Sequence, residues 1–156
     1  MFRSIGEFIG EIAGGSRQPQ AFGETDLRLA AAALLVHVVT LDQNFDAAEH
    51  AKLRDVLAYR FDLGIEEAEK LVQAALRADK EAVDLYRFTS VLNHHLDEEG
   101  RTRIVQMMFE VAYADGTLSE FEDNVVWRAS ELLNVPARER VTLRRQVREE
   151  KGEKQS

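Results

Sequence analysis

An acidic turn between two helical segments occurs twice in this chain, and this repeat restricts the fold more than any other feature. Residues 42–49 align with residues 115–122 at a constant spacing of 73 residues. Each copy follows an apolar helical segment and precedes a second helix, a short break and a third helix. The breaks, residues 62–64 and 134–136, align at a spacing of 72 residues. Because neither half could bury its apolar faces well alone, we expect two pseudo-symmetric helical halves that pack against each other.

Helical periodicity runs through the whole chain, and no segment shows the sustained alternation that is typical of strands. A short amphipathic segment comes first. The periodic segments then predict helices over residues 25–41, 46–60, 65–77, 84–96, 97–114, 119–133 and 136–148. Gly64 fits a helix boundary and Pro136 a first helical position. The sequence therefore predicts an all-α, compact single-domain bundle of about seven helices.

The length of 156 residues suits one domain with one hydrophobic core. With only two prolines and no long Gly/Ser tract, no internal linker is indicated. We expect an N-terminal amphipathic segment with a polar connection over residues 1–24. The helical domain should cover residues 25–149, and residues 150–156 should form a polar tail.

Charge and composition exclude several classes of function. The net charge of −8 argues against nucleic-acid binding, which needs a basic surface. Five arginines do gather near the C-terminus, interleaved with glutamates, and we interpret them as a solvated helix face. The absence of cysteine excludes disulfides and thiol chemistry. No secretory signal and no apolar run of membrane-spanning length is visible, so we expect a cytoplasmic protein.

The acids of the two turns divide into two kinds. Asp46 with Glu49, and Ser119 with Glu122, have the spacing of a capping box, which predicts a structural role for both glutamates. The aspartates that open the turns, at positions 42 and 115, follow apolar helices. A negative charge there opposes the helix macrodipole. Turn chemistry accounts moderately for the Asp-Gly pair at position 115 and poorly for the aspartate at position 42.

Clustered carboxylates in this arrangement suit hard divalent cations such as Ca²⁺, Mg²⁺ or Mn²⁺. The turns lack the ligand spacing of an EF-hand loop. The candidate metal-ligating residues are Asp42, Glu49, Asp115 and Glu122. From the spacing alone, a cation site and a purely structural pair of turns both remain open.

The second copy of the repeat carries a family resemblance. Residues 111–122 read Val-Ala-Tyr-Ala-Asp-Gly-Thr-Leu-Ser-Glu-Phe-Glu, and residues 128–135 read Arg-Ala-Ser-Glu-Leu-Leu-Asn-Val. This combination resembles the signature of TerB-like tellurite resistance proteins. That signature is an apolar helix running into Ala-Asp-Gly, then an acid, then a Leu-Leu-Gly-Val-like helix end. The resemblance covers roughly residues 25–148 and is weaker in the first copy, where Gln43 replaces the glycine.

The resemblance implies an all-helical fold of two similar halves with an acidic surface proposed to bind metal ions. It also implies a role in tellurite resistance or stress response, beside other proteins of that system or near membranes. The metal-related positions that it carries over are Asp115 and Glu122, with Asp42 and Glu49 added by internal symmetry.

The helix after the second turn carries the single tryptophan on its polar side. We expect the apolar stripe of this helix to consist of Leu118, Phe121, Val125, Ala129 and Leu132. Trp127 lies off this stripe. We interpret it either as a contact for a protein partner or as a side chain that a neighbouring element covers.

No catalytic motif such as a nucleophile elbow, a phosphate-binding loop or a zinc-binding His-Glu-x-x-His occurs. His37, inside an apolar helix, reads as a hydrogen-bonded core residue. The sequence thus favours a non-enzymatic binding or regulatory module with a protein partner and a divalent cation. One alternative is a metal-free interaction domain whose acids only cap helices, and another is a metal-dependent hydrolase. Contact with a membrane surface is not favoured, because the N-terminal stripe is short and carries acids.

Overall fold

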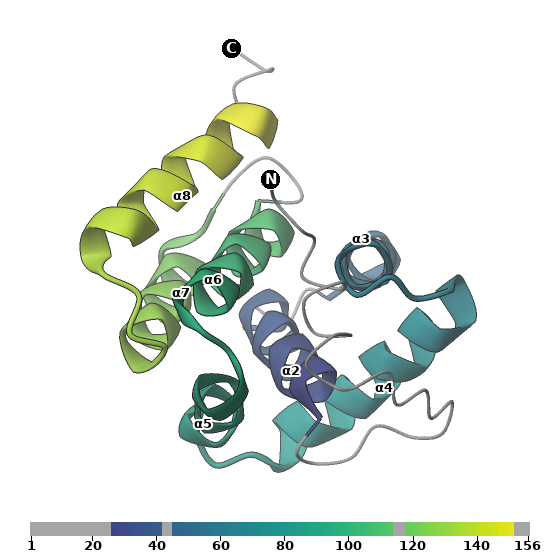
Figure 1. Cartoon of the computed structure of the whole chain (residues 1–156). Helices are drawn as coiled ribbons and strands as arrows, with labels where there is room; N and C mark the ends of the chain where they lie inside the picture. Colours follow the sequence, from purple (N-terminus) through teal and green to yellow (C-terminus); the bar gives the residue numbers. More distant parts are fainter. Residues whose placement is uncertain (1–25, 42–44, 114–117, 152–156) are drawn as a thin grey trace.

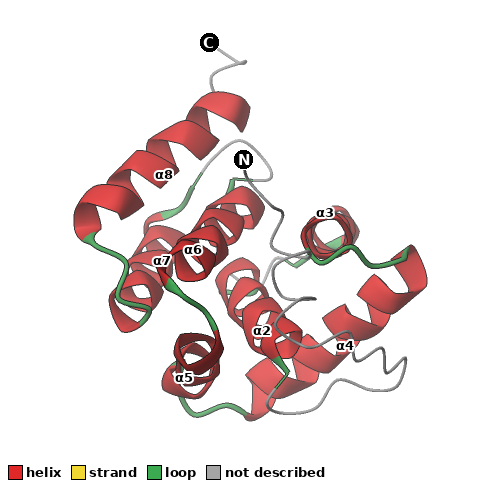
Figure 2. Cartoon of the chain, in the orientation of Figure 1, coloured by secondary structure: helices red, strands yellow, loops and turns green. Residues whose placement is uncertain are grey.

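The structure, a computed structural model, describes residues 26–41, 45–113 and 118–151, and its regular structure there is entirely helical (Figure 2). The helices in chain order are α2 (Leu27–Val39), α3 (Ala47–Arg60), α4 (Ile65–Glu81), α5 (Tyr86–His95), α6 (Glu98–Ala112), α7 (Glu120–Leu132) and α8 (Ala137–Lys151). The predicted all-α bundle is confirmed. The N-terminal amphipathic segment lies outside the described residues.

The most apolar segment of the sequence forms the central helix. All residues of α2 are buried except Arg28 and His37, and a helix that is apolar on every side is stable only inside a core. The four consecutive alanines at positions 30–33 are at most 1% exposed, and their small side chains let the neighbouring helices approach closely. Figure 1 shows α2 in the middle, in contact with helices from both halves of the chain.

Helices α4 and α8 occupy corresponding places in the two halves. Helix α4 packs against α2 and α3, and α8 packs against α6 and α7. Helix α6 supplies the second part of the core, with Ile104, Met107, Met108 and Phe109 fully buried. The order of packing thus follows the sequence repeat, while a twofold axis between the halves stays a prediction.

The breaks after α3 and α7 have the same backbone geometry. Asp62 has a φ of 56° and Asn134 a φ of 61°, and each is followed by a residue whose N–H reaches back into the helix. Leu63 donates to the carbonyl of Ala58 at 2.9 Å, and Val135 donates to that of Ser130 at 2.9 Å. This is the Schellman pattern, which needs a left-handed residue that Asn and Asp tolerate better than most.

The C-terminal end of α7 is held by side chains from the middle of the chain. Asn93 of α5 donates to the Leu132 carbonyl at 2.8 Å, and Arg101 of α6 donates to the Leu133 carbonyl at 2.9 Å. The last carbonyls of a helix lack intrahelical partners and carry negative partial charge, so an arginine is well suited to them. These bonds fix α7 relative to α5 and α6.

Two sequence-based expectations need correction. Helix α4 continues to Glu81 and α8 to Lys151, both beyond the expected ends. The predicted apolar stripe of α7 is confirmed for Ala129, which is buried, and for Leu118, Val125 and Leu132, which pack against the core. It was wrong for Phe121, which is 72% exposed, and it did not include Val126, which is fully buried. The buried face of α7 also includes Glu122, whose carboxylate caps the start of the helix. A search for apolar residues does not assign a glutamate to the core, so the sequence pattern did not predict its burial.

Within the described helices, none combines the length and the apolar character required to cross a membrane. Helix α2, the most apolar, has 13 residues.

Candidate functional site

The first acidic turn leads into α3 through a complete capping box. The Asp46 carboxylate accepts a hydrogen bond from the Glu49 N–H at 2.8 Å, and the Glu49 carboxylate accepts one from the Asp46 N–H at 3.2 Å. Phe45, just before the cap, stacks on His50 with the ring centroids 5.5 Å apart. Such a contact across the helix start sets the direction in which the chain enters the helix. The capping role predicted for Glu49 is confirmed.

The second acidic turn leads into α7 with the same pair of hydrogen bonds. The Ser119 hydroxyl accepts from the Glu122 N–H at 3.0 Å, and the Glu122 carboxylate accepts from the Ser119 N–H at 3.0 Å. Glu122 is only 8% exposed, so its hydrogen bonds act in a region of low dielectric constant. Each copy of the repeat therefore holds one glutamate in a defined orientation at the start of a helix.

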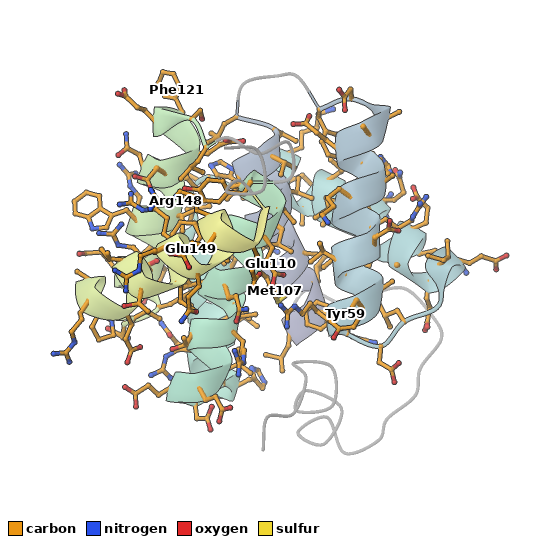
Figure 3. All side chains as sticks on the ribbon, turned by 90° about the horizontal axis from the view of Figure 1, so that it is seen from above. Tyr59, Met107, Glu110, Phe121, Arg148 and Glu149 are labelled. Atoms are coloured by element: carbon orange, nitrogen blue, oxygen red, sulfur yellow. The ribbon has the colours of Figure 1, made fainter. Side chains whose placement is uncertain are left out.

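The four predicted metal-ligating residues are placed only in part. Asp42 and Asp115 lie outside the described residues. Glu49 and Glu122 come from α3 and α7, which flank α2 and α6 on opposite sides (Figures 1 and 3). Over residues 26–41, 45–113 and 118–151, no three His, Cys, Asp or Glu side chains form a group that could hold a metal ion. A complete cation site would therefore need the turn aspartates.

His50, next to Glu49, is engaged with α4. Its Nε2 lies 2.9 and 3.0 Å from the two carboxylate oxygens of Glu69. The Gln73 amide also donates to Glu69, at 2.9 Å. Hydrogen bonds from Gln73 first, and then from His50, hold the pKa of Glu69 below its ordinary value of 4.5, although desolvation acts in the opposite direction. His50 thus serves to connect α3 with α4.

A buried ion pair that sequence reasoning missed connects α3 with α6. The guanidinium of Arg60 donates to both carboxylate oxygens of Glu110, with the Nε–Oε1 distance at 3.3 Å. The side chains are 16% and 12% exposed. One signal was available in the sequence: Glu110 interrupts an apolar helix and lies 73 residues after His37, which interrupts the other one.

His37 itself pairs with α4. Its Nδ1 lies 2.8 Å from Oδ1 of Asp79, and the side chains are 34% and 16% exposed. The predicted hydrogen bond is confirmed, but His37 is partly open to solvent and so is not a core residue. His37 of α2 and Glu110 of α6, which are equivalent in the repeat, therefore each pair with a charged side chain on another helix.

Trp127 lies on α7 beside α8 and is 47% exposed. The guanidinium of Arg140 sits 5.9 Å from the centre of its ring, within the range of a cation–π contact. Next to this pair, Arg144 donates to Asp123 at 3.1 Å. Trp127 is thus covered on one side by an arginine and open on the other. Its predicted role as a partner contact stays a prediction.

Tyr113 ends α6 just before the second acidic turn and is buried. Burial raises the pKa of its phenol above the ordinary value of 10.0, while the nearby guanidinium groups of Arg144 and Arg148 act against the rise. The phenol is therefore neutral at physiological pH, and α8 presents two cations towards this end of α6.

In a comparison with family models, residues 28–145 match the model of Tellurite resistance protein TerB. The matched range begins in α2 and ends in α8, so it includes both acidic turns and all of the helices between them. Searches of curated proteins and of solved structures returned no significant match.

Proposed function

The chain belongs to the TerB family of tellurite resistance proteins, and from this we propose that it is a non-enzymatic binding or regulatory module whose acidic turns hold a divalent cation. Its role would lie in tellurite resistance or a wider stress response, in the cytoplasm and with a protein partner. The proposal includes no catalytic step. One observation carries it: the two turns share the same cap geometry, with acids at equivalent positions.

The described residues fit a hard cation in their chemistry. The side chains in question are carboxylates, and oxygen donors are the ligands that Ca²⁺, Mg²⁺ and Mn²⁺ prefer. In each turn the glutamate is oriented by its capping bond, which lowers the entropy lost on binding. A hydrogen-bonded carboxylate can still ligate a metal, as ligating carboxylates in proteins commonly are hydrogen-bonded.

The aspartates have an electrostatic reason to bind a cation. Asp42 comes three residues after the end of α2, and Asp115 comes three residues after the end of α6. Both ends carry the negative pole of a helix, which repels a carboxylate. A bound cation would neutralise this repulsion. We assign Asp42 and Asp115 the main ligand role and Glu49 and Glu122 a supporting one.

Calorimetric titration with Ca²⁺, Mg²⁺, Mn²⁺ and Zn²⁺ tests the proposal. We expect heat with at least one of the first three ions and its loss in the Asp42→Asn/Asp115→Asn variant. The single variants Asp42→Asn and Asp115→Asn distinguish one shared site from two separate sites. A shared site would be lost in either single variant, whereas with two separate sites each single variant would keep one of them. A matched control is Asp55→Asn/Asp84→Asn, which removes two exposed acids elsewhere. Unchanged heat in the turn variant would sink the assignment.

A metal-free interaction domain is the second candidate, because Glu49 and Glu122 do have a structural role and Trp127 is half exposed. On this reading the working surface includes Trp127. In a pull-down, the Trp127→Ala variant would then lose partner proteins. A Tyr59→Ala control, which removes another exposed aromatic residue, would retain them. If Trp127→Ala keeps every partner, this candidate fails.

A further inference from the structure

Helix α8 separates its charges between two sides. Although arginines and glutamates alternate in the sequence, helical geometry places Arg138, Val141, Arg145 and Arg148 within roughly 80° of the circumference. All four are exposed to solvent. Glu139 and Glu150 lie on the opposite side, and Glu149 lies at the margin (Figure 3 labels Arg148 and Glu149). We call Arg138, Val141, Arg145 and Arg148 the arginine face, and its exposure agrees with the expected solvated helix face.

The remaining arginines of α8 contact side chains of α7, whereas within the fold the arginine face has only a longer-range electrostatic interaction, between Arg148 and the buried Tyr113. Arg144 pairs with Asp123, and Arg140 stacks on Trp127. By contrast, across the described part of the chain, the side chains of Arg138, Arg145 and Arg148 make no hydrogen bond or ion pair. Three cations without an acidic partner are thus presented side by side, in a protein whose net charge is −8.

An apolar contact is available beside these cations. Val141 is 42% exposed and lies in the middle of the arginine face. Arg140 and Arg144 lie between this face and α7, where Arg140 covers one side of the Trp127 ring and Arg144 pairs with Asp123. Tryptophan and arginine are the residues that most often dominate binding energy at protein interfaces, and arginine binds carboxylates with two parallel hydrogen bonds.

We propose that the arginine face, with Trp127, binds a short acidic segment of a partner protein that carries an apolar side chain among its carboxylates. The face extends for about 15 Å along the helix, the length of roughly three helical turns. A short segment meets only this positive face. A nucleic acid or an anionic lipid surface would extend past it and meet the remaining negative surface of the chain, which repels it. The proposal names the partner chemistry of an interaction module and does not depend on the cation.

The probe is a fluorescein-labelled peptide of roughly twelve residues. It consists of glutamate, with leucine at every third or fourth position. Binding is followed by fluorescence anisotropy in a buffer that contains a chelator, so that failure of the cation proposal has no effect on the result. We expect saturable binding that weakens as salt is raised from about 50 to about 300 mM. The same peptide with glutamine in place of glutamate should not bind.

The variant that tests the surface is Arg138→Gln/Arg145→Gln/Arg148→Gln. The control is Lys70→Gln/Arg77→Gln/Lys80→Gln, which removes three exposed cations at the same spacing from α4. We expect the first to weaken peptide binding about tenfold or more and the second to leave it within about twofold. Circular dichroism should show native helicity in both, because all six side chains are exposed.

Several results would overturn the proposal. They are no binding of the peptide to the unmodified protein, equal loss in both triple variants, or equal binding in the arginine variant. Tighter binding of a DNA duplex, or of vesicles with anionic lipid, would assign the face to another class of ligand. A dimer in sedimentation that the arginine variant dissociates would place a second copy of the chain there in place of a separate partner.

Discussion

Glu122 shows how a charged side chain becomes part of the buried face of a helix by capping its start. It lies on the buried face of α7, and its carboxylate accepts the N–H of Ser119 at the start of that helix. Without this acceptor, the N–H would lose its partner at a part-buried helix start. Glu49 has the same role at a less buried position. A comparison of the two glutamates therefore separates the contribution of capping to the free energy of unfolding from the contribution of burial.

We expect Glu122→Ala to lower the free energy of unfolding by about 1–2 kcal/mol, and Glu49→Ala by roughly half as much. The difference follows from the greater burial of Glu122. Urea denaturation measures both. Glu122→Gln is the matched control, since its amide oxygen can still accept the capping bond. Equal losses in the two alanine variants would contradict the account.

Glu69 gives the protein a pH-dependent contribution. Its pKa is lower in the folded chain than the ordinary 4.5, chiefly through the hydrogen bond from Gln73. The associated stabilisation is therefore present above pH 4.5 and is lost as the pH falls through the folded-state pKa. In urea titrations across this range, Glu69→Gln should reduce the loss of stability on acidification. Glu66→Gln, an exposed acid of the same helix, should not change it.

At the scale of elements, three polar pairs connect neighbouring helices, and one of them joins the two halves. Arg60 of α3 and Glu110 of α6 form an ion pair largely shielded from water, and one partner left alone would be a buried charge. His37 and His50 bind acids on α4 and so act within the first half. Of these three, only the Arg60–Glu110 pair connects the first half with the second.

We expect Glu110→Ala to lower the free energy of unfolding by about 3 kcal/mol, because it leaves the Arg60 guanidinium without its acid. The double variant Arg60→Met/Glu110→Met should be more stable than Glu110→Ala, since no buried charge remains. Chemical denaturation of the single and double variants gives the coupling energy. Costs that add without coupling would show that the pair does not act as a unit.

At the scale of the whole molecule, the helical order could be read from the sequence because apolar periodicity is a local property. The repeat also predicted the two capping boxes, whose partners lie three residues apart. The burial of Glu122 and the exposure of Phe121 on α7 could not be read in this way, because a search for apolar residues places phenylalanine and not glutamate in the core. The Arg60–Glu110 pair joins residues 50 positions apart, and only the packing of α3 on α6 determines it.

The candidate cation site was predicted from the sequence in composition but not in geometry. The glutamates are where the capping pattern put them. The aspartates lie outside the described residues, so their assignment depends on the repeat and on family membership. Turn conformation depends on longer-range contacts and on bound ions, which a local pattern does not contain. The measurement that is needed is therefore one that reports on the turns themselves.

The most direct test is the addition of Mn²⁺ to isotopically labelled protein, followed by amide nuclear magnetic resonance. The unpaired electrons of Mn²⁺ broaden the signals of nearby amides. The account predicts that broadening starts at the residues flanking the two acidic turns, Phe45 to His50 and Leu118 to Asp123. A chelator should reverse it, and the Asp42→Asn/Asp115→Asn variant should lack it. Broadening that is absent, spread evenly over the surface, or unchanged in that variant would contradict a cation site at the acidic turns.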